Sequence, residues 1–206
     1  MRGLLLEANH LTLGRLGRVL VRNINLAVRQ GELVEVIGPN GVGKSTLLRV
    51  LAGLAQPMAG LVRRKDCVWV GHDNALVETQ SVLENMRAVL PPSCQSLFLG
   101  KMACHQAMLQ ALDLWGLGRV LNAPAATLSA GQKRRLALAR TTLAPEKLWL
   151  LDEPSSALDA AGETLFKQQL ARHRAQGGAA VLATHGTPAG PGALRLELAA
   201  HQPGRL

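Results

Sequence analysis

Short apolar runs alternate along the chain with longer segments in which apolar residues recur at helical spacing. Residues 148–151 are all apolar, which indicates a strand buried on both faces. Residues 194–198 alternate strictly between apolar and polar, which indicates an edge strand. Strands that alternate with helices favour the α/β class with a mostly parallel sheet. Strands are predicted at about 4–8, 19–28, 33–37, 67–71, 148–152, 179–183 and 194–198, and helices at about 44–54, 81–90, 101–115, 131–143 and 160–176.

The turn between the predicted strand 33–37 and the next helix matches the pattern G-x-x-x-x-G-K-[ST] without a mismatch. In that pattern, backbone N–H groups and the helix N-terminus surround a polyphosphate. Lys44 reaches the β- and γ-phosphates, and the Ser45 hydroxyl is a Mg²⁺ ligand. The alternative is a chance glycine turn, against which the flanking strand and helix argue. The predicted nucleotide-binding residues are Gly38, Pro39, Asn40, Gly41, Val42, Gly43, Lys44, Ser45 and Thr46.

Two acidic residues, Asp152 and Glu153, follow the apolar run at 148–151. They are therefore expected at the carboxyl end of a buried strand, which is the edge where open α/β sheets bind ligands. Asp152 is predicted to hold Mg²⁺ and Glu153 to polarise the attacking water as a catalytic base. A strand that simply ends at solvent would also explain the pair, but the phosphate-binding loop upstream favours the functional interpretation.

At 206 residues, with 48% apolar and 18% charged residues, the chain has enough apolar material for one folded domain with a smaller subdomain. No segment resembles a signal peptide or reaches the roughly 18 apolar residues of a spanning helix, so we expect a cytosolic location or one on the cytosolic face of a membrane. The odd number and wide spacing of Cys67, Cys94 and Cys104 predict reduced thiols.

The net charge of +9 is unevenly distributed: residues 1–65 carry +7, residues 66–127 carry −2 and residues 128–206 carry +4. A site for an anionic nucleotide uses part of the excess of positive charge in residues 1–65 and 128–206. A solvated basic face accounts for most of the remaining positive charge. Nucleic acid is not an expected partner, because three Trp, two Phe and no Tyr leave little material for base stacking.

Three further segments resemble motifs of the ATPases of ABC transporters. Residues 128–132, Leu-Ser-Ala-Gly-Gln, resemble the family's signature, with Ala130 in place of the first glycine. Residues 156–159 resemble its D-loop, and His185 after residues 183–184 its switch histidine. The order and spacing of the motifs also fit, and the resemblance covers nearly the whole chain.

The resemblance implies a fold and a mechanism. The fold is the ABC type of P-loop NTPase: residues 1–71 and 128–206 form a core whose mostly parallel sheet has an antiparallel β edge, and residues 72–127 form an inserted helical subdomain. ATP and Mg²⁺ bind between two copies in a homodimer, which works with membrane permease subunits. Glu153 and His185 are catalytic, and Asp159 aligns the halves. The signature residues that bind the other copy's nucleotide are Ser129, Ala130, Gly131 and Gln132.

Two positions depart from the family pattern. Asp73 occupies the slot of a glutamine that touches Mg²⁺, and an acid there adds repulsion toward the γ-phosphate. Arg15 falls nearest the slot of an aromatic residue that stacks on adenine, and a guanidinium can also stack on a base. We expect Asp73 to affect coupling and rate more than nucleotide binding.

Within the family, the chain is most similar to the ATP-binding subunit of the cytochrome c maturation haem exporter. This rests on the compact length, on Trp-Val-Gly-His at 69–72, on the signature, on Leu-Ala-Arg at 138–140 and on the short tail after His185. The resemblance implies a peripheral protein on the cytoplasmic face of the bacterial inner membrane that drives release of a haem chaperone. No direct haem binding is expected, since there is no C-x-x-C-H motif. The alternatives are another cargo (lipoprotein, ion or small molecule) and a nucleotide-gated module with little turnover.

Overall fold

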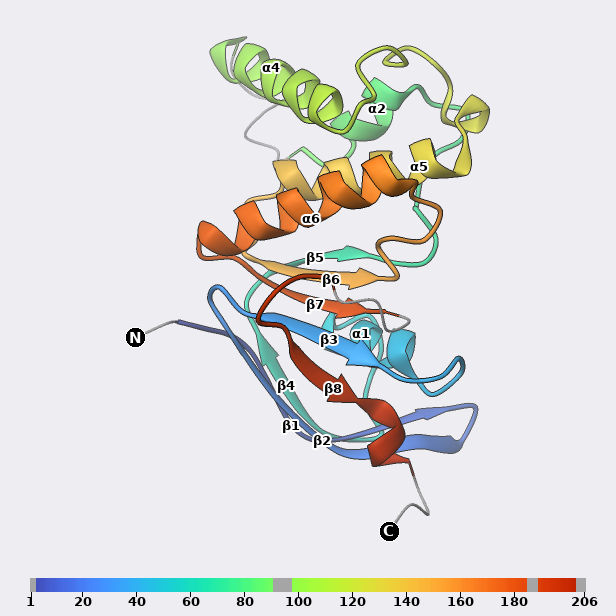
Figure 1. Ribbon diagram of the computed structural model, residues 1–206, viewed down its shortest axis with the longest axis vertical. Coiled ribbons are helices and arrows are strands. Elements are labelled where there is room, and N and C mark those ends of the chain that lie inside the picture. The colour runs from blue at the N-terminus through green and yellow to red at the C-terminus, as the bar shows by residue number, and fades with distance from the viewer. Residues whose placement is uncertain (1–2, 91–97, 185–188, 203–206) are drawn as a thin grey trace. The chain divides into compact units, whose positions relative to one another are not determined.

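The computed structural model describes residues 3–90, 98–184 and 189–202. Its largest sheet has five strands, all parallel, in the order β5-β6-β7-β3-β8 (Figure 1). The predicted α/β class with a parallel core sheet is therefore confirmed. The strand that was predicted at 194–198 as an edge strand does lie at an edge of this sheet. The strands span Leu33–Ile37 (β3), Cys67–Val70 (β5), Leu148–Asp152 (β6), Ala179–Ala183 (β7) and Leu194–Glu197 (β8).

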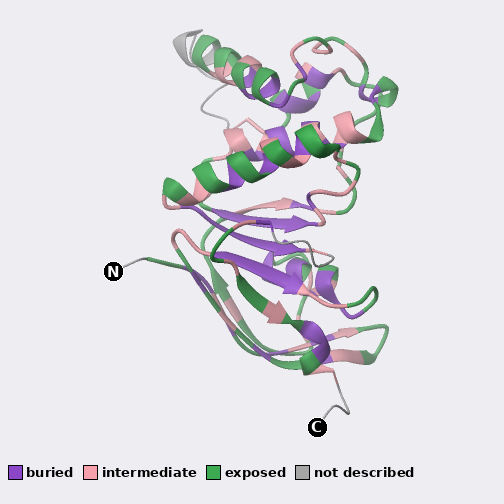
Figure 2. Cartoon of the chain, viewed as in Figure 1, coloured by how far each residue is buried: buried purple, intermediate pink, exposed green. Residues whose placement is uncertain are grey.

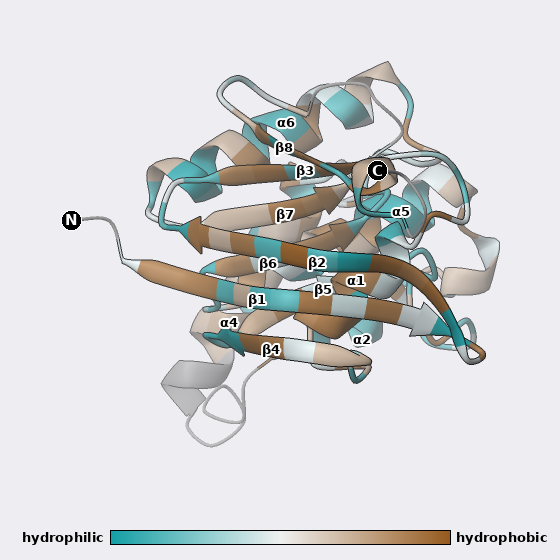
Figure 3. Cartoon of the chain, turned by 90° about the horizontal axis from the view of Figure 1, so that it is seen from below, coloured by the Kyte–Doolittle hydropathy of each residue, from teal (hydrophilic) through white to brown (hydrophobic). Residues whose placement is uncertain are grey.

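A second sheet is antiparallel and has the order β2-β1-β4, with strands at Leu4–Arg15 (β1), Arg18–Arg29 (β2) and Ala59–Arg64 (β4). Positive φ angles at Leu16 and Gly17 make the tight two-residue turn between β1 and β2. Apolar and polar segments alternate along β1 and β2 (Figure 3), as in a sheet with one buried face. The sequence did not predict β4, because its residues are mostly exposed and lack that alternation.

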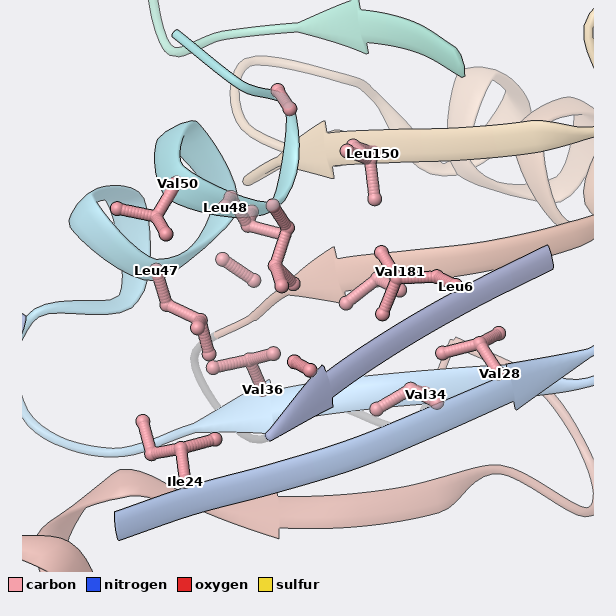
Figure 4. Packing of buried hydrophobic residues seen from close by; sticks show 14 of the residues in the cluster. Leu6, Ile24, Val28, Val34, Val36, Leu47, Leu48, Val50, Leu150 and Val181 are labelled. Atoms are coloured by element: carbon pink, nitrogen blue, oxygen red, sulfur yellow. The ribbon is translucent and has the colours of Figure 1, made fainter. Parts of the chain in front are cut away.

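Helix α1, Lys44–Leu51, packs with both sheets to form the main hydrophobic core. Figure 4 shows Leu47, Leu48 and Val50 of α1 together with Val34 and Val36 of β3. All residues of β6 and β7 are buried, as continuous apolar runs predict (Figure 2). The core therefore fixes the start of α1 and the ends of the central strands. The predicted nucleotide-binding residues and the two predicted acids lie at these points.

The chain divides into two compact units, of which the first holds both sheets and α1 and comprises residues 1–72, 146–154 and 167–206. The second comprises residues 73–145 and 155–166 and is largely helical. The division into a core and a subdomain at 72–127 stays a prediction. The remaining elements are α2 (Val82–Arg87), α4 (Phe98–Leu114), α5 (Ala130–Ala139), α6 (Ala160–Ala175) and the 3₁₀ helices η1 (Ala125–Thr127), η2 (Arg140–Leu143) and η3 (Leu198–His201).

The cysteines differ from their prediction in one case. Cys67 is a free, half-buried thiol whose pKa is raised, chiefly by burial. Cys104 is disulfide-bonded, so the prediction of a reduced thiol is wrong there, and Cys94 lies outside the described residues. Among the helices that the structure describes, none is long and apolar enough to cross a bilayer.

A stacked pair links α6 to β6 in the first unit. The rings of Trp149 and His173 are parallel to within 11°, with their centroids 3.8 Å apart. The Nε2 atom of His173 lies 3.2 Å from the carbonyl oxygen of Lys147 and 3.3 Å from that of Ala179, which identifies it as the protonated nitrogen. Burial lowers the pKa of His173 below its ordinary value of 6.5. The imidazole is therefore held in its neutral form.

This lowered pKa predicts a loss of stability in mild acid. Below pH 6.5 the unfolded chain binds a proton at His173 more readily than the folded chain does. The contribution is thus fully present above that pH and is lost as the pH falls through the unfolded pKa toward the lower folded one. We expect His173→Gln to reduce the fall in melting temperature between pH 7.5 and 5.5 by roughly a few degrees. Thermal unfolding would measure this, with exposed His105→Gln as control; an unchanged pH dependence in His173→Gln would contradict it.

Candidate functional site

The predicted phosphate-binding loop joins β3 to α1 and is closed by the lysine side chain. Lys44 is only 6% exposed, and its Nζ donates to the carbonyl oxygens of Gly38, at 2.7 Å, and Pro39, at 3.3 Å. Gly43 has a φ of 117°, a left-handed conformation that glycine tolerates best, and it caps α1. The ammonium group is therefore held at the loop itself, where an anion would meet it.

The N-terminus of α1 has the properties of an anion site. The first N–H groups of a helix have no partner within the helix, and the cap residue Gly43 has no side chain to satisfy them. The first turn of this described helix contains no acidic residue. Ser45, in that turn, is exposed, and Thr46 is partly exposed. Backbone N–H groups, the helix dipole and a lysine thus converge, which is an arrangement suited to a polyphosphate.

The two predicted acids lie at the end of β6, in the same unit. Asp152 is its last residue and is 3% exposed, whereas the side chain of Glu153 is 24% exposed. Glu153 has a φ of 49°, and its N–H donates to the carbonyl oxygen of Ala183 on β7 at 3.0 Å. A non-glycine residue in this conformation stores strain, which occurs most often at functional sites. The Nδ1 atom of exposed His72 lies 4.0 Å from Glu153 Oε2.

The loop, the acids and the chain after β7 leave the same edge of the sheet. In the strand order, β7 lies between β6 and β3, and all three are parallel. Thr184, the residue after β7, donates its N–H to the carbonyl oxygen of Val36 at 3.2 Å. His185 lies outside the described residues. Parallel strands therefore bring the predicted phosphate-binding loop and the predicted acids to one edge, although they are separated by more than half of the chain.

The predicted signature lies in the second unit, at the start of α5. Ser129 caps this helix: its hydroxyl accepts from the N–H of Gln132 at 3.2 Å, and Gln132 Oε1 accepts from the N–H of Ser129 at 2.9 Å. A Cβ on Gly131 would lie 2.9 Å from the carbonyl oxygen of Ala157, so this position has no room for a side chain. Ala130 is exposed at the helix start. The capped N-terminus of α5 is therefore exposed at Ser129 and Ala130, whereas Gly131 lies close to Ala157 of the predicted D-loop.

Asp159 joins the signature helix to the start of α6. Its Oδ1 accepts from the N–H of Gly162 at 2.8 Å and from the guanidinium of Arg135 on α5. The N–H of Gly162 first, and Arg135 second, lower the pKa of Asp159. Sequence reasoning did not identify Arg135 as a partner, since a basic run after the signature does not indicate which acid it meets. The structure thus places the predicted Asp159 in contact with the predicted signature helix.

The segment with Asp73 is held by two arginines that sequence reasoning also missed. Asp73 is exposed, and its Oδ1 accepts from the N–H of Ala75 at 3.2 Å. Buried Arg134 donates to Asn74 Oδ1 at 3.1 Å, and Arg140 donates to the carbonyl oxygen of Ala75 at 2.8 Å. Burial lowers the pKa of Arg140. These contacts tie the Asp73 segment to the signature helix and to η2 after it.

The predicted site residues are thus distributed over both units. The phosphate-binding loop, Asp152 and Glu153 belong to the first unit, and the signature, Asp159 and Asp73 to the second. Arg15, the candidate for adenine stacking, is exposed at the end of β1 in the first unit.

Comparisons with known proteins agree with the motifs. The family model described as "ABC transporter" matches residues 21–156. The "Cytochrome c biogenesis ATP-binding export protein CcmA" of Pseudomonas savastanoi is 42% identical over 195 residues, covering 88% of each chain. The protein of the same name from Cupriavidus necator is 41% identical over 206 residues, covering 94% of this chain and 88% of the relative. A solved "putative metal-chelate type ABC transporter" in an inward-facing conformation has a TM-score of 0.79 at 27% identity, covering 95% of this chain and 80% of that chain.

Proposed function

Because this chain belongs to the ABC transporter family, and within it to the group of the cytochrome c biogenesis ATP-binding export proteins, we propose that it hydrolyses ATP to power a haem-pathway exporter. The observation that carries the proposal is the identity of about two residues in five over 88% or more of the chain with relatives that share this printed name. In this proposal, ATP hydrolysis by this chain drives release of the haem chaperone for cytochrome c assembly. Haem itself is handled by the partner subunits.

In this proposal the first unit binds ATP and carries out hydrolysis. The backbone of residues 38–46 and the ammonium of Lys44 hold the phosphates, which the open N-terminus of α1 supports. The Ser45 hydroxyl and the Asp152 carboxylate are hard oxygen donors of the kind that Mg²⁺ prefers, so the residues fit this ion. Bound Mg²⁺ neutralises charge on the phosphates. Glu153 accepts the proton of the attacking water, and His185 contacts the γ-phosphate.

The second unit meets the nucleotide of another copy. Ser129, Ala130, Gly131 and Gln132 form the start of α5, and the capping hydrogen bonds between Ser129 and Gln132 preorganise that helix terminus as a second anion site. The active form is therefore a homodimer in which Asp159 aligns the halves. The dimer binds integral permease subunits on the cytoplasmic face of the bacterial inner membrane.

A second candidate function follows from Asp73. Its exposed carboxylate stands where the family has a glutamine, and an additional negative charge toward the γ-phosphate slows turnover. The chain would then act as a nucleotide-gated module with little hydrolysis. Steady-state ATPase activity of the reconstituted transporter complex separates the two candidates, because only an enzyme turns over repeatedly.

The proposed pathway is tested by covalent haem staining of periplasmic c-type cytochromes. In cells whose only copy carries Lys44→Ala, at normal protein level, we expect the staining to be lost. Exposed Lys167→Ala, which removes the same charge from α6, should keep it. Normal staining with Lys44→Ala would sink the haem assignment and move the cargo to a lipoprotein, an ion or another small molecule.

A further inference from the structure

A carboxylate is buried in the middle of an otherwise apolar strand. Glu35 is the third residue of β3 and is only 2% exposed. Its neighbours Val34 and Val36 belong to the core beside α1 (Figure 4), so by the alternation of strands Glu35 points to the opposite face of the sheet. A buried carboxylate is costly unless it is paired and hydrogen-bonded. None of the roles proposed above for the phosphate-binding loop, the acids or the signature uses Glu35.

Within residues 3–90, 98–184 and 189–202, two groups contact this carboxylate. Its Oε1 accepts a hydrogen bond from the backbone N–H of Ala189 at 2.5 Å. Its Oε2 lies 3.6 Å from Nε of Arg195, which stands directly opposite Glu35 in the pairing of β3 with β8. The arginine is 56% exposed, so it supplies charge from the solvent side. The hydrogen bond from Ala189 is buried. The negative charge of Glu35 strengthens this hydrogen bond, which joins two segments that are 154 positions apart in the chain.

The link fixes one end of the chain segment that follows β7. At the entry of that segment, the N–H of Thr184 donates to the carbonyl oxygen of Val36, and at its exit the N–H of Ala189 donates to Glu35. Both ends are therefore bound to adjacent residues of one strand. The same strand continues directly into the phosphate-binding loop at Gly38. Residues 185–188 lie between the two attachment points and include His185.

We propose that Glu35 is a positioning residue for ATP hydrolysis. It holds the exit of the segment that carries His185 against the strand that carries the phosphate-binding loop. Arg195 neutralises the carboxylate, and the hydrogen bond to Ala189 does the positioning. The inference rests on the proposed function, in which His185 contacts the γ-phosphate, and it adds a residue that touches neither nucleotide nor metal.

The test separates the acceptor oxygen from the charge. Glu35→Gln keeps an oxygen for the N–H of Ala189, and Arg195→Gln removes the positive charge opposite Glu35 while keeping Glu35 as the acceptor. We expect both to keep kcat within about 3-fold of the unmodified enzyme. Glu35→Leu fills the same space but has no acceptor for the N–H of Ala189. We expect its kcat to fall ~10-fold or more, because small misplacements of a reacting group have large effects on rate. The KM for ATP should stay within about 3-fold of that of the unmodified enzyme.

A double-mutant cycle shows whether the effect passes through His185. If Glu35 acts by positioning that residue, Glu35→Leu lowers kcat no further in a His185→Ala background. An equal additional loss in that background would overturn the proposal, as would Glu35→Gln losing as much activity as Glu35→Leu. If Glu35→Leu does not fold, Ala189→Pro removes the donor instead and should give the same non-additive loss. Full activity in His185→Ala itself would overturn the role proposed for His185, independently of what Glu35→Gln does.

Discussion

Glu153→Gln is expected to stop turnover while leaving nucleotide binding intact. The amide has the size of the carboxylate but cannot accept a proton from the attacking water, so kcat should fall about 10²–10⁴-fold. The KM for ATP should stay within about 3-fold, because the groups that hold the phosphates belong to α1 and its loop. In the proposed homodimer, unhydrolysed ATP should also hold two copies together. Gel filtration with ATP and Mg²⁺ would detect the trapped dimer.

A matched control comes from the same sheet. Glu197 is likewise an acid at the end of a parallel strand, β8, and Glu197→Gln should hydrolyse ATP at the normal rate. Turnover by Glu153→Gln at that rate would exclude Glu153 as the base. A monomer of Glu153→Gln in saturating ATP would count against the nucleotide sandwich and would leave the assignment of the base unaffected.

Lys44→Ala is expected to weaken ATP binding and abolish hydrolysis. Its ammonium is buried at the loop and is held there by the carbonyl oxygens of Gly38 and Pro39, so Lys44→Ala removes a positive charge from the place where the phosphates are proposed to bind. A hydrogen bond to a charged group is worth about 1.5–3 kcal/mol, which corresponds to a roughly 10- to 150-fold rise in the Kd for ATP. Titration with a fluorescent ATP analogue measures the affinity, and phosphate release measures the turnover.

The control for this experiment is Lys167→Ala, which removes one positive charge from an exposed position of α6 in the same unit. It should bind and hydrolyse ATP normally, which separates a local contact from the effect of net charge. Unchanged affinity in Lys44→Ala would show that the loop does not bind the phosphates through this side chain. The proposed mechanism would then fail at its first step, whatever the cargo.

The sequence by itself determined the elements whose information is local. The predicted phosphate-binding loop is contiguous in the chain, so its glycines, Lys44 and Ser45 predict it without knowledge of any contact. Buried strands such as β6 and β7 were predictable because a strand covered on both faces must be apolar throughout. The acids after β6 follow from the same pattern. The order of the motifs then sufficed to identify the family.

Only the tertiary structure decided which distant residues meet. Arg134 meets Asn74 across 60 positions, Arg135 meets Asp159 across 24, and Ala189 meets Glu35 across 154. A basic run or a lone acid in the sequence does not indicate its partner, because packing of whole elements brings the two together. Strand β4 escaped prediction for a related reason: its residues are exposed, and pairing with β1 makes it a strand. Local pattern thus predicted the candidate site residues, and long-range packing specified the contacts that hold them in place.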